Sequence, residues 1–485
     1  MSTMRTDVAV VGAGPAGIAA ALAAADLGNR VVLVDAGRAL GGQIYRQPAT
    51  ASAAEVTSVG PKLPGRLRRA LVHSGIWYLP GTTVWQAVRG SDGAEFRLWL
   101  TAAAGGADGG VEPDQVRARA VVIATGASEI VLPFPGWELP GVTTVGAAQA
   151  LLKGQGVTAG RRLLVAGSGP LLLPAAAGLA EAGVDVVAVL EANPVGTSAV
   201  VAAARLAPFA SKRKEAAAYA RILARHRVPV KTGHAVVAAG GDGEVEQATV
   251  SRVDRDWRPV PETAQTLRVD AIHVSFGFSP ALDLSRALGC ADLPQAGRPA
   301  AAVWCDLDQA TSVPGVFAAG ETTGVAGADV AELEGYLAGA AAARWLGTAS
   351  AEFFDQKLGP VRAGLRRARR FARGLDDLYP WRPGGLDWPT PDTVLCRCEE
   401  VPWAAIEAAV AAGARDVRAV KGVTRCGMGY CQGRMCGPAV QQAVAAATGR
   451  GLTAVGDLGS RPILTPVTLG EIAGSAPPSD QSVGR

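Results

Sequence analysis

Four of the chain's seven cysteines lie close together near its C-terminal end, where they could bind a metal centre. Cys396 and Cys398 are separated by one residue. After thirty-two further residues, Cys431 and Cys436 are separated by four, in a glycine-rich segment. Two such pairs can bring four thiolates to one tetrahedral ion or to a two-iron cluster. Zinc sites usually pair cysteines separated by roughly two to four residues, so the spacing favours iron–sulfur, with a structural Zn²⁺ ion as the alternative.

The N-terminal segment has the pattern of a dinucleotide-binding loop. An apolar strand at 8–11 runs into a Gly-Ala-Gly-Pro-Ala-Gly turn, and a second apolar strand ends at Asp35. Gly12 permits a tight turn, Gly14 lets the backbone approach a pyrophosphate, and Gly17 lets the next helix pack closely on the strand. The phosphates then lie at the helix N-terminus, and Asp35, twenty-three residues after Gly12, can reach a ribose hydroxyl. The segment therefore predicts a dinucleotide site rather than a plain glycine-rich turn.

A second unit repeats this pattern between residues 162 and 191. Gly167 and Gly169 follow an apolar strand, and Glu191 ends the next strand twenty-four residues after Gly167. Leu172 replaces the third glycine, so the helix must lie further from the strand or begin later. Two interpretations stay open: a nicotinamide site, in which Glu191 would favour NAD over NADP, or a degenerate or otherwise occupied nucleotide site.

The composition is that of a globular protein with several domains. Its 485 residues predict about three domains, and 49% of them are apolar. A net charge of +4 is too small and too scattered to indicate nucleic-acid binding. Two uncharged stretches, 8–25 and 163–180, each contain Gly-x-Gly-Pro, so we interpret them as strand–turn–helix units rather than transmembrane segments or a signal peptide. We expect a cytoplasmic protein with reduced cysteines.

The first unit resembles the two-dinucleotide-binding-domain flavoproteins, which include thioredoxin and glutathione reductases. The resemblance extends to Gly41-Gly-Gln43, to Gly81-Thr-Thr-Val84 and to the strand that ends at Gly126. Near residue 320 the family has Gly-Asp, and here the acid that would hold the ribityl chain is one methylene longer. The resemblance implies an FAD lined by Gly12, Gly14, Pro15, Ala16, Gly17, Asp35, Gly42, Gln43, Val84, Thr125, Gly126, Gly320 and Glu321. In the second unit it implies NAD(H), or ATP, bound by Gly167, Gly169 and Glu191.

We expect an α/β fold with two Rossmann-like domains and a small helical domain. The FAD-binding domain takes residues 1–155 and 269–348, the second nucleotide-binding domain 156–268, a connector 349–391, the cysteine domain 392–450 and a tail 451–485. An Ala/Gly-rich helix at about 327–346 would pack close to the flavin with its positive end toward it. The connector carries a run of arginines, either a solvated helix face or a docking surface for an acidic partner: Arg362, Arg366, Arg367, Arg369, Arg370 and Arg373.

The cysteine segment resembles the bacterioferritin-associated-ferredoxin-like (BFD-like) [2Fe–2S] domain. The resemblance rests on Cys396-Arg-Cys398-Glu-Glu and on Thr424-Arg-Cys-Gly-Met-Gly-Tyr-Cys431-Gln-Gly-Arg-Met-Cys436. It implies that the ligands are Cys396, Cys398, Cys431 and Cys436. Cys426 is then not a ligand, although it is the nearest substitute. A flavin accepts electrons in pairs and a [2Fe–2S] centre carries one at a time, so together they would convert two-electron into one-electron transfer.

The sequence shows no further catalytic group. The segment after Gly41 lacks the cysteine pair of the disulfide reductases, and Cys290 and Cys305 are isolated, as expected of small buried residues. None of the four histidines lies in a catalytic motif. Catalytic residues therefore stay unknown, and the cluster is the expected outlet for the flavin's electrons.

Nearly the whole chain is similar to the FAD- and [2Fe–2S]-containing electron-transfer subunits of hetero-oligomeric amino-acid and opine dehydrogenases. This family includes octopine and nopaline oxidase A subunits, hydrogen cyanide synthase B subunits and the alpha subunits of proline and D-hydroxyproline dehydrogenases. In such assemblies the beta subunit is a flavoprotein of the D-amino-acid-oxidase type, which oxidises a carbon–nitrogen bond. Electrons then leave through the alpha subunit, in some members through an FMN at the interface and a small ferredoxin-like gamma subunit.

This resemblance implies an oxidoreductase subunit that is cytoplasmic or peripheral to the inner membrane. One alternative is a self-contained NAD(P)H:acceptor oxidoreductase, against which Leu172 counts. Another is a non-catalytic scaffold whose nucleotide sites only stabilise the fold, which the intact FAD motifs and the four spaced cysteines oppose. The amino acid or opine itself cannot be read from this chain.

Overall fold

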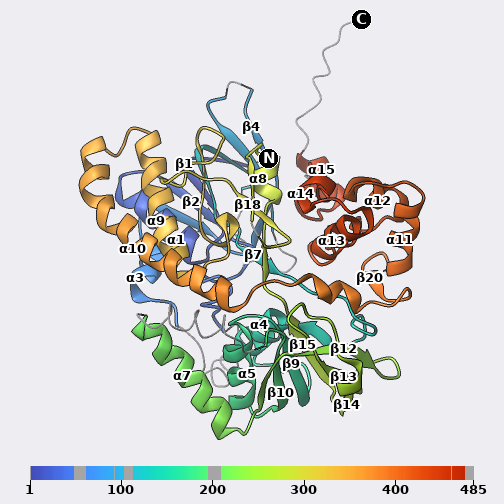
Figure 1. Ribbon diagram of the computed structural model, residues 1–485. Helices are drawn as coiled ribbons and strands as arrows, with labels where there is room; N and C mark the ends of the chain where they lie inside the picture. Colours follow the sequence, from blue (N-terminus) through green and yellow to red (C-terminus); the bar gives the residue numbers. More distant parts are fainter. Residues whose placement is uncertain are drawn as a thin grey trace, which may run out of the picture.

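The computed structural model describes residues 2–48, 62–91, 93–102, 113–194, 209–295, 297–459 and 461–475. One nucleotide-binding sheet lies above another, and a small helical domain lies beside them (Figure 1). The expected fold class is therefore confirmed. Every helix in the described part of the chain is too short or too polar to cross a membrane.

The first sheet has seven strands. Six of them follow the order β3-β2-β1-β6-β5-β4, and the seventh, β19, pairs with the C-terminal end of β6. β1, β2, β3, β6 and β19 are parallel, whereas β4 and β5 form an antiparallel extension. All four residues of β2 are buried, as in parallel strands covered on both faces. The strands are β1 (Thr3–Val11), β2 (Val31–Val34), β3 (Ile76–Leu79), β4 (Thr82–Arg89), β5 (Phe96–Ala102), β6 (Gln115–Ile123) and β19 (Val316–Ala318).

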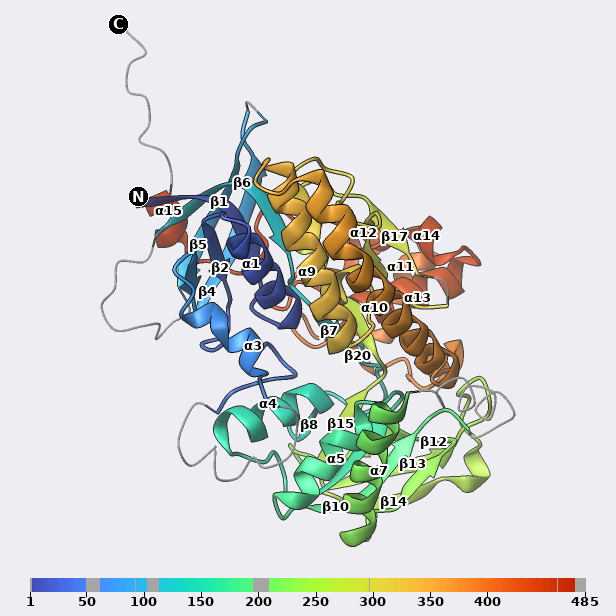
Figure 2. The same ribbon diagram turned by 90° about the vertical axis from the view of Figure 1, so that its left-hand side faces the viewer.

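Helix α1 (Pro15–Asp26) is packed against the first sheet on one side and α9 (Ala328–Trp345) on the other. Figure 2 shows α1, α9 and α10 (Ala351–Leu378) side by side. A Cβ atom on Gly17 would lie 1.7 Å from the carbonyl oxygen of Gly12. On the other face, Cβ atoms on Gly335 and Gly339 would lie 2.0 and 2.2 Å from backbone oxygens of α1. These glycines let the turn after β1, α1 and α9 approach one another closely. The Ala/Gly-rich helix expected at about 327–346 is α9, and it packs on α1.

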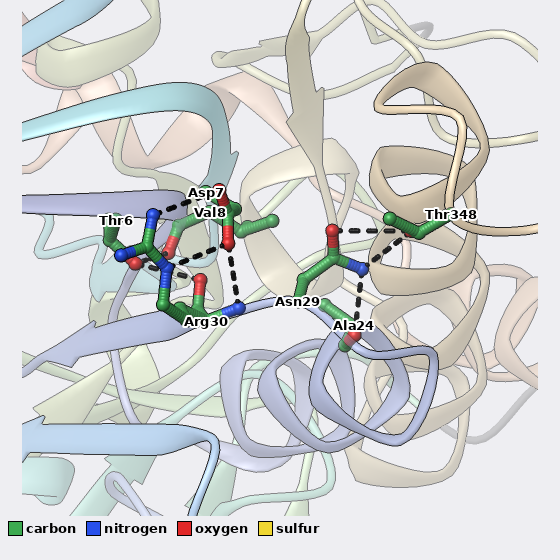
Figure 3. A network of polar contacts seen from close by, with 7 residues as sticks. All are labelled: Thr6, Asp7, Val8, Ala24, Asn29, Arg30 and Thr348. Carbon is green, nitrogen blue, oxygen red and sulfur yellow. Dashed lines mark hydrogen bonds and ion pairs between the residues drawn. The ribbon is translucent and has the colours of Figure 1, made fainter.

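Polar contacts fix the far end of the same unit (Figure 3). Asn29, after α1, donates from Nδ2 to the carbonyl oxygen of Ala24 and to the Thr348 hydroxyl, each at 2.9 Å. Asp7 in β1 accepts from the backbone nitrogen of Arg30 at 3.0 Å and from its guanidinium at 3.1 Å. The turn between α1 and β2 is therefore tied both to the first strand and to the end of α9.

The second sheet has five parallel strands in the order β11-β10-β9-β15-β8. Three helices and a three-stranded antiparallel sheet accompany it (Figure 1). Its strands are β8 (Val142–Thr144), β9 (Arg162–Gly167), β10 (Asp185–Glu191), β11 (Val230–Thr232) and β15 (Ala271–Ser275). The helices are α4 (Val145–Gln155), α5 (Leu172–Glu181) and α7 (Ala210–Arg225), and the antiparallel strands are β12 (His234–Gly240), β13 (Gln247–Arg252) and β14 (Gln265–Arg268).

The boundaries of this second domain differ from the expected ones at 155 and 269. We expected the apolar segment from Ala271 to return to the FAD-binding domain, but β15 pairs with β9 and β8 inside the second sheet. β8 and α4, expected in the first domain, also belong to the second. The chain crosses between the domains in the short antiparallel pair of β7 (Ala127–Glu129) and β16 (Phe278–Pro280). An isolated apolar strand does not reveal its sheet, because pairing is decided by non-local contacts.

The connector forms the long helix α10, which packs along α9. Arg369 makes an ion pair of 2.8 Å with Glu334, a carboxylate of α9 that is only 3% exposed. Arg362 pairs with Asp308. The four other arginines of the run, Arg366, Arg367, Arg370 and Arg373, are exposed.

The remaining elements surround the FAD-binding domain or build the cysteine domain. Around the first sheet lie α3 (Gly65–Arg68), α8 (Asp283–Ala287), β17 (Asp292–Pro294) and β18 (Ala301–Val303). The cysteine domain contains β20 (Val394–Cys396), β21 (Val401–Pro402), α11 (Trp403–Ala411), α12 (Val417–Thr424), α13 (Gly437–Thr448) and α14 (Leu452–Val455). Of the expected tail, α14 and α15 (Leu469–Ser475) are described, and residues 476–485 lie outside the described residues.

The contact between α1 and α9 predicts a strong effect of one added methyl group. Gly335→Ala should lower the free energy of unfolding by about 1–3 kcal/mol, because the new Cβ collides with the backbone of Ala16. The melting temperature measured by calorimetry should fall. Gly178→Ala in α5 is the matched control, since its Cβ would meet nothing closer than a Leu152 methyl at 3.7 Å. Equal melting temperatures for the two variants would contradict the close packing.

Candidate functional site

One cavity of about 2570 Å³ runs between the two nucleotide-binding sheets. All of the residues expected to line an FAD, with the exception of Gly17, line this cavity. Gly17 instead packs against Gly12 beneath the loop. In the second unit Gly169 lines the cavity, whereas Gly167 and Glu191 do not. The fold therefore gathers the first set of predicted residues around one space and the second set only in part.

The first glycine loop leaves room in front of its backbone. Gly12 has φ of +106°, and a Cβ there would lie 2.2 Å from the carbonyl oxygen of Ala124. A Cβ on Gly14 would meet nothing nearer than Gly42 Cα at 4.0 Å. The protein itself therefore has room for a side chain at residue 14. Gly14 lines the cavity, and the close approach of a pyrophosphate requires this open backbone. α1 begins directly after it, so the helix N-terminus faces the same space.

Two carboxylates hold the edges of this site. Asp35 accepts hydrogen bonds from the backbone nitrogens of Ala13 and Gly37, and burial raises its pKa. Glu321 accepts from the backbone nitrogen of Gly327 at 2.8 Å, at the start of α9, and burial raises its pKa as well. Both side chains line the cavity, and both currently satisfy loop N–H groups.

Glu334 was not predicted from the sequence, although it supports this site. It accepts from the backbone nitrogen of Gly320 at 2.9 Å and from the Thr323 hydroxyl at 2.8 Å, while its other oxygen pairs with Arg369. The loop before α9 is therefore held by a buried charge whose partner comes from α10. The only indication of this contact in the sequence was an acidic residue in an Ala-rich segment, followed by the arginine run of the connector.

The second glycine loop differs from the first in the way its helix begins. α1 begins at Pro15, next to Gly14, whereas α5 begins at Leu172, three residues after Gly169. Leu172 is only 2% exposed and packs in the core of the second domain. Of the two expected consequences of Leu172, a greater helix–strand distance or a later helix start, the structure has the later start.

Glu191 is turned into this loop and away from the cavity. It accepts hydrogen bonds from the backbone nitrogens of Gly169 and Asn193, each at 2.9 Å, and burial raises its pKa. Asn193 also donates from Nδ2 to Ser168 at 2.8 Å. The loop thus satisfies its own polar groups, and the acid is not presented to a ribose.

Five cysteine thiols gather in the small domain in two adjacent groups. The sulfur atoms of Cys396, Cys426 and Cys436 all lie within 4.8 Å of one another and are buried. Cys398, which is exposed, and Cys431, which is half-buried, are hydrogen-bonded to each other. Hydrogen bonds from the Cys426 and Cys436 thiols hold the pKa of Cys396 well below its usual range. All five donors are sulfur atoms, the ligand type of an iron–sulfur cluster.

An arginine inside each cysteine pair ties the small domain to the rest of the protein. Arg397 lies between the first two cysteines; its guanidinium is 4.9 Å from the Trp137 ring centre and donates to the carbonyl oxygen of Glu138 at 2.8 Å. Arg434 lies between the second two; it donates to Asp283 at 3.0 Å and to the carbonyl oxygen of Leu464 at 2.9 Å. Arg434 and Asp283 also line the large cavity. Arg434 therefore connects the second cysteine pair to the space that the FAD residues surround.

Cys290 and Cys305 were expected to be isolated buried residues. Both pack in the core of the FAD-binding domain, and burial raises the pKa of Cys305 to about 12. His273 is fully buried, and desolvation lowers its pKa to about 4. A catalytic acid, base or nucleophile needs a pKa close to the working pH. The two thiols and the imidazole of His273 do not meet this condition at neutral pH.

Two family models match the chain. Residues 6–344 match the pyridine nucleotide-disulphide oxidoreductase family, and residues 394–446 match the BFD-like [2Fe–2S] binding domain. The first match confirms the flavoprotein architecture and its FAD. The second confirms the iron–sulfur interpretation of the cysteines over a structural zinc ion.

Relatives and one solved structure agree with this division. The A subunit of opine oxidase from Agrobacterium tumefaciens is 34% identical, over 96% of this chain and 91% of that protein. Hydrogen cyanide synthase subunit HcnB of Pseudomonas protegens is 32% identical, over 99% of this chain and all of that protein. L-proline dehydrogenase from P. horikoshii has the same fold, with a TM-score of 0.68 and 19% identity over 97% of this chain and 80% of that one.

The resemblance drawn from the motifs is therefore confirmed, and the chain is a flavin-dependent oxidoreductase with FAD and a [2Fe–2S] cluster as its cofactors. It belongs to the pyridine nucleotide-disulphide oxidoreductase family, in the group of FAD- and [2Fe–2S]-containing oxidase subunits that includes HcnB and the A subunit of opine oxidase.

Proposed function

We propose that this chain is the electron-transfer subunit of a hetero-oligomeric amino-acid or opine dehydrogenase. The observation that carries the proposal is that one cavity is lined both by the FAD loops and by Arg434, which lies within the second cysteine pair. FAD supplies two-electron chemistry and the [2Fe–2S] centre one-electron chemistry. A chain that binds both, with Arg434 of the second cysteine pair on the wall of the flavin cavity, is suited to receive electron pairs and to release them singly.

The substrate is proposed to be oxidised on a partner subunit. Relatives at 32–34% identity are named as single subunits of larger oxidases, which supports the presence of partners. We propose that the partner is a D-amino-acid-oxidase-like flavoprotein beta subunit, with an interface FMN and a ferredoxin-like gamma subunit in some assemblies. Proline, hydroxyproline, glycine and opines are the candidate substrates. The proposed location is the cytoplasm or the inner face of the inner membrane.

The chain's own residues would hold the flavin in three places. The open backbone at Gly14 and the N-terminus of α1 accept the pyrophosphate. Asp35, at the end of β2, takes the ribose hydroxyls, and Glu321, at the start of α9, takes the ribityl chain. Each carboxylate then exchanges a loop N–H group for a ligand hydroxyl, which conserves its hydrogen bonds.

We propose that Cys396, Cys398, Cys431 and Cys436 are the iron ligands. Their proximity in two groups suggests a pairing: Cys396 with Cys436 on one iron, and Cys398 with Cys431 on the other. Cys426 is the fifth thiol, next to Cys396 and Cys436. We assign it a supporting role, because hydrogen bonds to cluster sulfurs adjust the reduction potential.

The second candidate function is a self-contained NAD(P)H:acceptor oxidoreductase. The position of Gly169 on the cavity wall favours it. Leu172 and the inward position of Glu191 count against it, because the close packing of the helix on the strand and the contact with a ribose are both lost.

The first prediction concerns the flavin. Gly14→Val should leave the fold intact, because the new Cβ would meet no protein atom nearer than Gly42 Cα at 4.0 Å, and should abolish the flavin absorbance near 450 nm of the purified protein. Gly65→Val is the control: it also meets nothing within 4 Å and lies outside the cavity. Full flavin content in the Gly14 variant would refute the proposed pyrophosphate position.

The second prediction concerns the cluster. Cys431→Ser should lose the [2Fe–2S] spectrum and at least half of the bound iron, because one iron loses a thiolate. Cys426→Ser, an equally small change, should keep its iron content and shift the reduction potential of the cluster measured by EPR-monitored titration. Loss of iron from the Cys426 variant together with retention in the Cys431 variant would overturn the ligand assignment.

The third prediction separates the two functions. The chain alone, kept anaerobic, should be reduced slowly or not at all by NADH or by amino acids. Co-expression with a D-amino-acid-oxidase-like partner should give rapid reduction of flavin and cluster by one of the candidate amino acids, followed by absorbance at 450 nm. Rapid reduction of the chain alone by NADH would instead establish the second function.

A further inference from the structure

We propose that an exposed apolar patch beside the cysteine loop is the docking surface for an acidic one-electron carrier protein, an inference that rests on the proposed function. The patch consists of Val423, Met428 and Tyr430, whose exposed fractions are 70%, 41% and 82%. Large apolar side chains with such exposure, gathered on one short segment, indicate an interaction site.

The patch directly adjoins the cluster ligands. Met428 and Tyr430 flank Gly429, where a Cβ atom would lie 2.3 Å from the Cβ of Cys398. Cys398 itself is exposed, and Tyr430 immediately precedes Cys431. The buried thiols of Cys396 and Cys436 lie deeper in the domain. One side of the thiol group is therefore close to solvent, and the segment that carries Met428 and Tyr430 adjoins that side.

The charges around the patch are predominantly positive. Partial burial lowers the pKa of Lys421, and the nearby charges of Arg461 and Arg418 lower it further. None of these three forms an ion pair within the residues that the structure describes. Arg425, on the same segment, pairs with Glu399 at 2.8 Å. Arg461 also donates to the carbonyl oxygen of Gly427 in the cysteine loop. The four cations outnumber the acids of the same region, Glu399, Glu400 and the α12 cap Asp416, so the rim complements an acidic protein.

The position of the patch leaves it open to a partner. α12, which ends at Thr424 beside Val423, lies on the outer edge of the small domain, away from both sheets (Figure 1). Contacts between electron-transfer proteins are small and transient, and complementary charges raise their association rates. Each encounter would move one electron from this chain's cluster to the oxidised metal centre of the carrier. Two encounters account for the electron pair that the flavin receives.

The test follows re-oxidation of the cluster in the holoprotein. The full chain, with FAD and cluster, is reduced by dithionite, freed of excess and mixed in a stopped-flow instrument with an acidic b-type cytochrome. Wild type should react at a rate that falls with increasing salt. Tyr430→Ser, and Arg418→Glu combined with Lys421→Glu, should each slow this reaction at least tenfold. Both variants should keep the wild-type rate with neutral benzoquinone, which needs no docking surface.

Arg366→Glu combined with Arg370→Glu in α10 is the matched control, because it makes the same change of charge on an exposed helix of another domain. It should leave the cytochrome rate unchanged. Unchanged rates in the patch variants, an equal effect of the control, or faster reduction of a basic c-type cytochrome by wild type would each overturn the proposal. Because dithionite supplies the electrons, this experiment does not depend on reduction by an amino acid. A failure of the amino-acid assay would contradict the proposed function without affecting the result for the docking surface.

Discussion

The close packing of α1 is the constraint on which the rest of the structure depends. Gly17 places the helix against the first strand and its turn, and Gly335 and Gly339 let α9 approach from the other side, at distances that a single Cβ would prevent. Because α1 is held from both sides, its N-terminus has one position, at the floor of the cavity. The open backbone at Gly14 is useful only because that position is set.

The coupling of the two cofactor sites depends on a few polar contacts. Arg397 and Arg434 each lie within a cysteine pair and contact the second and the first nucleotide-binding domain, respectively. An ion pair that is partly exposed contributes only about 0–1 kcal/mol, so such contacts set orientation more than stability. Arg369 does the same for the loop before α9 through the buried Glu334. The site is thus assembled by arginines that reach across domain boundaries.

The two glycine loops share a sequence motif but differ in structure. Gly14 and Gly169 both leave their backbone open and both line the cavity, but only in the first loop does the helix begin directly after this glycine. In the second, Leu172 delays the helix and Glu191 bonds to the loop itself. Asp35 makes the same kind of hydrogen bonds to the first loop, but Asp35 lines the cavity and Glu191 does not. The second unit contributes a wall of the cavity and a surface for Arg397.

Local patterns of the sequence determined the two Rossmann-like units, the FAD loop, the four candidate ligands and the irregularity at Leu172, because each depends on neighbouring residues or on fixed spacing. Only the tertiary structure decided which sheet takes β15, since strand pairing joins segments over a hundred residues apart. It also decided that Cys426 lies among the thiols and that Glu334, Arg397 and Arg434 support the site. Such contacts depend on how whole domains pack, and spacing along the chain carries no record of that.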